Sequence, residues 1–281
     1  DYFSNRQLVA LKTFSDLVGE ARERVLADAL AAGHPAGPRL DGMAPSDPAG
    51  AEAYADAVAT YLGLVISRLT DYSSSLTTWA SNPQMEILRN VFARQAIPMA
   101  WDFGEGNPFF ESSGSVSRMA AAVARAVEGF PAAPTAVATQ QDAIQAVDAR
   151  AVLSTDPPYY DNIGYSDLSD FFYVWLRRSL AVVLPSLFET VLVPKQEELV
   201  ANPYRHGGRD AAKDFFEDGF RRVFREARAS AGTDYPIAVY YAFKQSDSSA
   251  EGDASSGWET LLQGMIESGW YITATWPVRT E

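Results

Sequence analysis

The feature that most constrains this chain is the segment at residues 154–161, Ser-Thr-Asp-Pro-Pro-Tyr-Tyr-Asp. It follows a short apolar run, Ala151-Val152-Leu153, which is typical of a buried strand. The two prolines end any strand here, because neither has a backbone N–H to donate to a neighbouring strand. We therefore expect Asp156 and Tyr159 to project from the carboxyl end of a strand, where open α/β sheets bind their ligands.

The residue types in this motif suit a flat ring that carries an amino group. Asp156 and the carbonyl of Pro157 can accept hydrogen bonds from an exocyclic NH2, and Tyr159 can stack on the ring face. Pro158 keeps the turn rigid. The alternative is a strand-end turn with surface tyrosines. The preceding strand and the aromatic helix expected after the motif favour a functional role.

Asp-Pro-Pro-Tyr after a strand resembles the signature of the S-adenosylmethionine-dependent amino-methyltransferases, which methylate adenine or cytosine on the exocyclic nitrogen. The longer stretch at residues 156–178 resembles the large bacterial adenine-specific DNA methylases that contain a zinc ribbon. Further matching segments lie at residues 6–8, 101–103, 194–199, 205–208, 241–245, 257–260 and 273–279. The resemblance therefore covers most of the chain.

The resemblance implies an α/β fold with a partial Rossmann-like methyltransferase sheet, preceded by a mainly helical region. It places a helical accessory region at residues 1–132 and the C-terminal half of the catalytic domain at residues 133–281. The first strand of such a sheet, with its Phe/Gly-rich cofactor turn, is not evident, so we expect the upstream half to lie elsewhere. Both chain ends are expected to be boundaries within a longer protein.

S-adenosylmethionine is the cofactor that the resemblance implies, and DNA is the partner. The resemblance also assigns the catalytic role to Asp156, Pro157, Pro158 and Tyr159. Positioning and electrostatics would account for catalysis, without a covalent intermediate.

Composition limits the alternatives. With 281 residues, 47% of them hydrophobic, the chain can bury a full core. It has no cysteine, so it lacks disulfides and the zinc ribbon of the resembled family. Its two histidines, His34 and His206, are far apart in the sequence, and no metal site is expected. No signal peptide or long apolar run is present, so we expect a soluble cytoplasmic protein with no membrane partner.

The net charge of −13 argues against a self-sufficient DNA clamp, because phosphate contacts dominate affinity for nucleic acid. The basic surface must then be local, or be supplied by the rest of a larger protein.

Hydrophobic periodicity predicts most of the helices and strands. Helices are expected at residues 5–31, 51–80, 85–95, 117–128, 142–147, 168–183, 210–230 and 258–268, and strands at 135–139, 151–154, 237–243 and 271–276. The first two helices should pair as a hairpin. The strand–helix–strand order after Pro134 is that of a doubly wound sheet.

Four residues are candidates for contacts to the cofactor. Asp102, Gly104 and Gly106 resemble a glycine-rich nucleotide-binding turn, although no clear strand–helix junction surrounds them, and a loop lining the pocket is the alternative. Asp142 holds the position that flanks the cofactor adenine in the resembled class. A helix N-cap is the other interpretation of Asp142.

Five residues are candidates for contacts to the nucleic acid: Tyr160, Tyr165, Arg205, His206 and Lys244. The segment at residues 205–208 could cradle a phosphate, or its glycines could simply permit a turn. Lys244 ends another expected strand. We expect that strand to lie beside the one before Asp156, so that both open on one crevice with Tyr159 partly exposed.

Three functions follow from these features. The favoured one is methylation of an exocyclic amine of a flipped base in DNA, with adenine as the preferred base. Methylation of RNA or of a protein glutamine stays open, because the motif recognises a planar amine and not a polymer. A non-catalytic interaction or scaffold domain that kept the fold is the third, and the acidic charge favours it.

Overall fold

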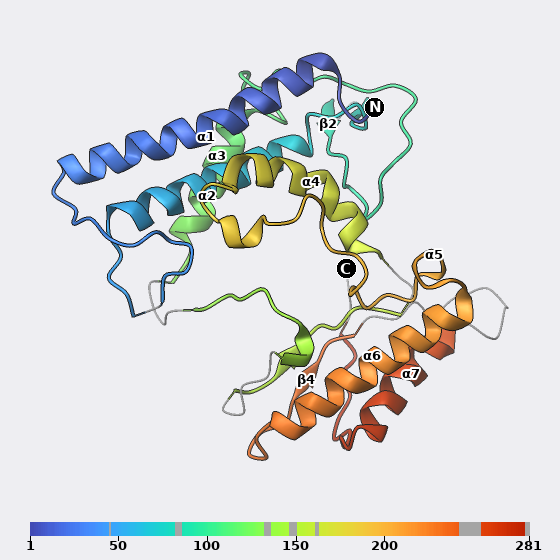
Figure 1. Ribbon diagram of the computed structural model, residues 1–281. Coiled ribbons are helices and arrows are strands. Elements are labelled where there is room, and N and C mark those ends of the chain that lie inside the picture. The colour runs from blue at the N-terminus through green and yellow to red at the C-terminus, as the bar shows by residue number, and fades with distance from the viewer. Residues whose placement is uncertain are drawn as a thin grey trace. The chain divides into compact units, whose positions relative to one another are not determined.

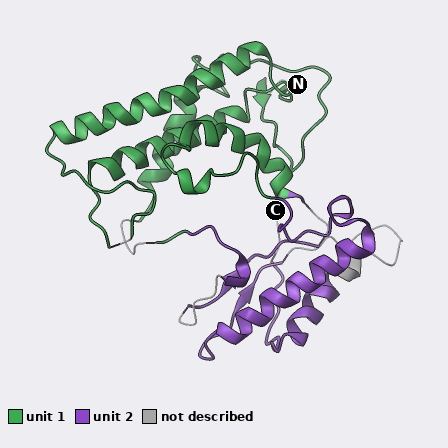
Figure 2. Cartoon of the chain, in the orientation of Figure 1, with its two compact units in different colours: residues 1–138, 165–194 green, residues 139–164, 195–281 purple. Residues whose placement is uncertain are grey.

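The computed structural model describes residues 1–44, 46–81, 86–131, 136–145, 151–160, 163–241 and 254–278 of a helix-rich α/β protein (Figure 1). The chain divides into two compact units (Figure 2). Unit 1 comprises Asp1–Ala138 and Tyr165–Pro194, and unit 2 comprises Thr139–Gly164 and Lys195–Glu281.

Unit 1 is built on two long helices, α1 (Asn5–Ala31) and α2 (Ala51–Thr70). Ser4 caps α1: its hydroxyl accepts from the backbone N–H of Gln7, and the Gln7 side chain accepts from the backbone N–H of Ser4. Buried side chains of the two helices pack against each other, so the predicted hairpin is confirmed. The third helix, α3 (Val116–Glu128), packs on α2 and lies where the sequence predicted it.

The second predicted helix was too long, and the third does not exist as a helix. After α2 ends, Asp71 accepts hydrogen bonds from the side chain of Asn90 and the backbone N–H of Phe92. These bonds close a loop that holds an antiparallel pair, β1 (Thr78–Ala80) with β2 (Ile87–Arg89). Leu88 is buried between two exposed neighbours, which is the alternation of a strand and not of a helix.

Helix α4 (Tyr165–Leu180) belongs to unit 1, together with the 3-10 turn η2 (Pro185–Leu187). Its Phe171, Trp175 and Leu180 are buried, and Trp175 and Leu180 join clusters that contain residues of α1 and α2. The compact units therefore differ from the predicted division at residues 132 and 133. Periodicity showed that this helix has an apolar face but not which partner covers it.

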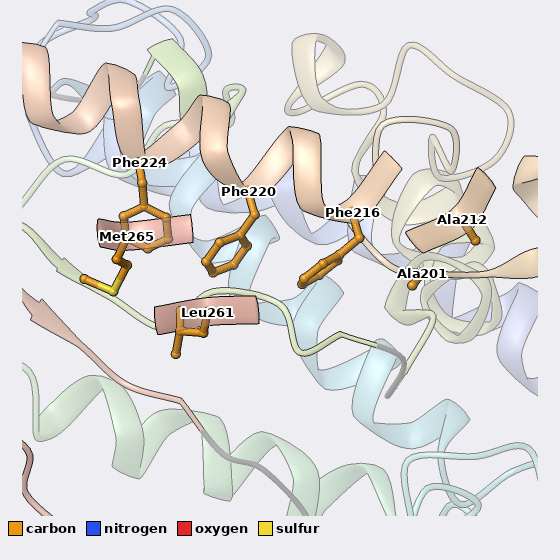
Figure 3. Close-up of a cluster of buried hydrophobic side chains, with 7 residues drawn as sticks. All are labelled: Ala201, Ala212, Phe216, Phe220, Phe224, Leu261 and Met265. Atoms are coloured by element: carbon orange, nitrogen blue, oxygen red, sulfur yellow. The ribbon is translucent and has the colours of Figure 1, made fainter. Parts of the chain in front are cut away.

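Unit 2 is organised around α6 (Arg209–Ser230) and α7 (Ala254–Glu267), both close to their predicted positions. Figure 3 shows Phe216, Phe220 and Phe224 on one face of α6, pointing toward Leu261 and Met265 of α7. The unit also contains η1 (Ala143–Gln145), α5 (Pro203–His206) and two strands, β3 (Ser154–Thr155) and β4 (Ala238–Val239).

The strands expected after Pro134 are shorter than predicted or absent from the described residues. Residues 136–139 and 271–276 form no strand, and Val152 is 60% exposed, so the run before Asp156 is not buried. The β4 segment is covered on one side: Ile237 and Val239 pack on the phenylalanine cluster of α6, whereas Tyr240 is 59% exposed. The α/β class is confirmed, and within the described residues the sheet here has two strands.

None of the helices in the described part of the chain combines the length and the apolar character needed to span a lipid bilayer.

Asp56 of α2 is the main polar anchor of unit 1. Its side chain is fully buried. It contacts Arg22 of α1 at 2.5 Å, Arg39 of the loop between α1 and α2 at 2.6 Å, and the backbone N–H of Leu40 at 3.0 Å. Burial opposes ionisation of this carboxyl, but the hydrogen bonds from Arg39, Leu40 and Arg22 outweigh it and hold the pKa of Asp56 below its ordinary value. Arg39 also donates to the carbonyl of Val182, which joins the segment after α4 to the same anchor.

We predict that Asp56→Asn destabilises the protein by about 3–5 kcal/mol at pH 7, because two arginines then face an uncharged partner inside the protein. The lowered pKa means that the contribution of Asp56 is complete above about pH 4 and is lost as the pH falls through the native pKa. Denaturant unfolding at a series of pH values should therefore show the two proteins converging in acid. Asp16→Asn is the control, because Asp16 pairs with Arg178 at the surface and its loss should change stability by about 1 kcal/mol or less.

Two glycines in helix interiors should respond oppositely to alanine. A Cβ on Gly63 would lie 2.8 Å from three side-chain carbons of Leu180, so Gly63→Ala should destabilise by about 1–3 kcal/mol through overpacking. A Cβ on Gly19 meets nothing within 4 Å, so Gly19→Ala should stabilise by about 0.5–1 kcal/mol. Thermal melts of both variants test the pair, and a stabilised Gly63→Ala would contradict the packing of α4 on α2.

Candidate functional site

The candidate site begins with two parallel strands. Ser154 and Thr155 of β3 lie opposite Ala238 and Val239 of β4. The backbone N–H of Ala238 donates to the carbonyl of Leu153 at 3.0 Å, and that of Tyr240 donates to Thr155 at 2.8 Å. Because the pairing is parallel, both strands end at the same edge, as open sheets require for a ligand site. The expectation that these strands are neighbours is confirmed.

Three side chains meet beyond that edge. Asp156 follows β3 directly and is exposed, while Tyr159 is partly exposed, as predicted. The hydroxyl of Tyr159 donates to Oδ1 of Asp156 at 3.1 Å. The ring of Tyr159 meets that of Tyr241, from the end of the β4 segment, at 5.1 Å between centroids and an angle of 78°. Pro157 and Pro158 form the turn between the carboxylate and the ring, and both are partly buried.

The neighbouring Tyr160 has a structural role. Its ring stands edge-on to Phe216 of α6, with 5.2 Å between centroids, and its carbonyl accepts from the backbone N–H of Ala201. The chain after the motif is thus fixed to the phenylalanine cluster. Tyr160 was predicted as a nucleic-acid contact, and this packing explains it without one.

The segment at residues 205–208 also favours the structural alternative. Gly207 (φ 77°) ends α5 in the left-handed conformation and Gly208 (φ 136°) extends the turn, which glycine permits. Arg205 pairs with Glu198 at 2.6 Å and donates to the carbonyl of Lys195. His206 stacks on Phe215 with 3.9 Å between ring centroids. The guanidinium thus has polar protein partners, which weakens the prediction of a phosphate cradle, whereas the imidazole has a stacking partner and its buried Nε2 has no hydrogen-bond partner among the described residues.

The glycines around Glu105 serve to anchor a loop. Glu105 accepts hydrogen bonds from Ser4 and Arg6 at the start of α1. The Ser4 hydroxyl contributes most and Arg6 adds to it, so that the pKa of Glu105 is lowered despite partial burial. A Cβ on Gly104 would lie 2.7 Å from Leu88, and one on Gly106 would lie 3.2 Å from it. Both glycines let the loop pack closely on Leu88 of β2, and a Cβ at either position would make that side chain move.

Each of the four predicted cofactor residues lies in a local structure of its own unit. Asp102, Gly104 and Gly106 lie in unit 1, where Asp102 accepts only from the adjacent backbone N–H of Phe103 among the bonds described. Asp142 lies in unit 2, and its carboxylate accepts from the backbone N–H of Ile144 at the start of η1. The N-cap interpretation of Asp142 thus has direct geometric support.

Two further candidates remain, Tyr165 and Lys244. Tyr165 is the first residue of α4 in unit 1 and is 49% exposed. Lys244 lies outside the described residues. In the part of the chain that the structure describes, no group of three or more histidine, aspartate and glutamate side chains could hold a metal ion.

Sequence reasoning missed Tyr241 and the ring behind it, Trp258, which lies 6.3 Å from Tyr241 between centroids. A signal was present: Ile237, Val239 and Tyr241 alternate, so a strand places them on one face. The contact between Tyr241 and Tyr159 depends on the register between two distant strands, which the sequence does not show.

No protein-family model, curated protein or solved structure matches this chain. The function therefore has to be argued from the site.

We predict that residues 1–281 bind S-adenosylmethionine weakly or not at all, because the residues proposed to hold it have structural roles instead. Isothermal titration calorimetry measures this directly. Tight binding with one-to-one stoichiometry, lost in Gly104→Ala but kept in Gly19→Ala, would contradict the prediction and would assign the loop around Glu105 to the cofactor.

Proposed function

We propose that this protein takes part in methylation of an exocyclic amine of a flipped DNA base, with adenine favoured. One observation carries the proposal: Asp156, Tyr159 and Tyr241 meet at the carboxyl edge of two parallel strands. An acceptor carboxylate beside aromatic rings is the set of groups that a planar amine needs. In this proposal β3 and β4 are part of a Rossmann-like methyltransferase sheet.

Asp156 and the Pro157 carbonyl act on the amine itself. The lone pair of an exocyclic amine is delocalised into its ring, which makes it a poor nucleophile. Two acceptors on its hydrogens favour a pyramidal nitrogen whose lone pair is free to attack, and the fixed geometry replaces much of the ordering that the reaction would need in water. S-adenosylmethionine, the donor that the resemblance implies, would supply the methyl group.

Tyr159 acts on the ring of the substrate. Extruding a base from its stack costs a few kcal/mol, and stacking on an aromatic side chain returns about 1–3 kcal/mol. Tyr159 is partly exposed next to the carboxylate, so one ring can stack on it while its amine reaches Asp156. This arrangement does not distinguish adenine from cytosine.

The polymer that carries the amine is a separate question. Because the net charge is −13, the basic surface that DNA binding needs must be local or be supplied by the rest of a larger protein. RNA and protein glutamine are therefore the other substrates to test, because the same site recognises a planar amine in each of them.

We predict that Asp156→Ala in the full-length protein lowers the single-turnover rate of methyl transfer about 10²–10³-fold, as expected when one preorganised hydrogen-bonding group is removed. Asp156→Asn should keep part of the activity, because its amide oxygen still accepts. Tyr159→Ala should be severe and Tyr159→Phe milder, because the ring face still stacks although the hydroxyl bond to Oδ1 of Asp156 is lost. The measurement uses labelled S-adenosylmethionine with DNA, RNA and protein substrates.

Thermal melts are the control for this series. Asp156 is exposed at a strand end, so all four variants should melt near the wild type. Near-normal methylation by Asp156→Ala would show that the motif is a structural turn. Absence of methyl transfer to any substrate by the wild-type protein would favour the scaffold function.

A further inference from the structure

Tyr241 is the residue at the strand edge to which no role has yet been assigned. Its ring packs edge-on against Tyr159 on one side and lies near Trp258 on the other. It also packs against the cluster that α6 and α7 form, to which Ile237 and Val239 of the same segment contribute. Tyr241 is therefore held by a rigid part of unit 2.

Tyr159, in contrast, stands on the turn that follows two prolines. A side chain on a turn can choose among several staggered rotamers unless packing selects one. The ring of Tyr241 at 5.1 Å and 78° gives the edge-to-face geometry that aromatic pairs prefer. That contact selects the rotamer in which the Tyr159 hydroxyl reaches Oδ1 of Asp156.

We infer that Tyr241 is a positioning residue that fixes the ring of Tyr159 and, through the Tyr159 hydroxyl, the carboxylate of Asp156. The inference rests on the proposed function. A carboxylate has room for about four hydrogen bonds on its two oxygens. The hydroxyl at Oδ1 can therefore hold Asp156 in place while a substrate amine binds the other oxygen.

The chain supplies a matched control one residue away. Tyr240 is the same residue type and is 59% exposed, while its backbone N–H bonds to Thr155. Replacing the Tyr240 side chain leaves that backbone bond intact. Tyr240→Leu thus removes an equal ring from the same strand without touching Tyr159.

The first measurement is fluorine NMR of the full-length protein with 3-fluorotyrosine placed at position 159. Tyr241→Leu and Tyr241→Met, which both lack the ring, should shift and broaden the resonance. Tyr241→Phe should restore it nearly to the wild-type position, and Tyr240→Leu should leave it unchanged. Two ring-free variants are used so that misfolding of one does not remove the test.

The second measurement is methyl-transfer kinetics with the same substitutions in unlabelled protein. The ring-free variants should lower the single-turnover rate about tenfold, with KM for the nucleic acid nearly unchanged, because phosphate contacts dominate affinity. Tyr241→Phe should recover most of the rate. If Tyr241 had only a structural role, its loss would lower the melting temperature and change KM as well. A lower rate with an unchanged KM would then not be observed.

The fluorine resonance and the methyl-transfer rate together distinguish failure of the role of Tyr241 from failure of the proposed function. An unchanged fluorine resonance in the ring-free variants overturns the role of Tyr241, whatever the activity. A shifted resonance with an unchanged rate, in a protein that Asp156→Ala inactivates, overturns it as well. If no protein of the series transfers a methyl group, the proposed function fails, and the fluorine resonance still decides whether Tyr241 fixes Tyr159.

Discussion

Two strands of two residues each can stay paired in water only if other elements cover them, and the phenylalanine face of α6 provides this cover. The same face receives Ile237, Val239 and Tyr241 from the β4 segment and Tyr160 from the chain after β3. One helix therefore covers the chain on both sides of the strand pair, whose spacing is set by its backbone hydrogen bonds. The candidate site forms because Asp156 and Tyr241 follow the two strands at the same edge of the sheet.

The long amphipathic helices could be predicted from sequence, because each one repeats its apolar residues over many turns. The helix at residues 5–31 and the helix around Phe216, Phe220 and Phe224 are the clearest cases. Short strands could not be predicted well. Ile87 and Leu88 fit either a helix or a strand, and the hydrogen bonds of Asp71 with Asn90 and Phe92 decide between them.

For the candidate site, the sequence identified the residues that lie next to each other in the chain and missed the rest. Asp156 and Tyr159 form one local motif, and the structure shows them in direct contact. Tyr241 joins them only through parallel pairing. The glycines at 104 and 106 show the same limit, since their close approach to Leu88 is a contact that no local pattern reveals.

The chain leaves unit 2 after Gly164, contributes α4 to unit 1, and returns to unit 2 at Lys195. Unit 2 therefore closes a loop whose middle is a folded part of its neighbour. Once α4 has packed on α1 and α2, fewer flexible residues remain between β3 and α6. A shorter flexible loop loses less entropy when its ends are brought together. Docking of α4 on unit 1 therefore lowers the entropic cost of bringing the two halves of unit 2 together, although each unit keeps its own core.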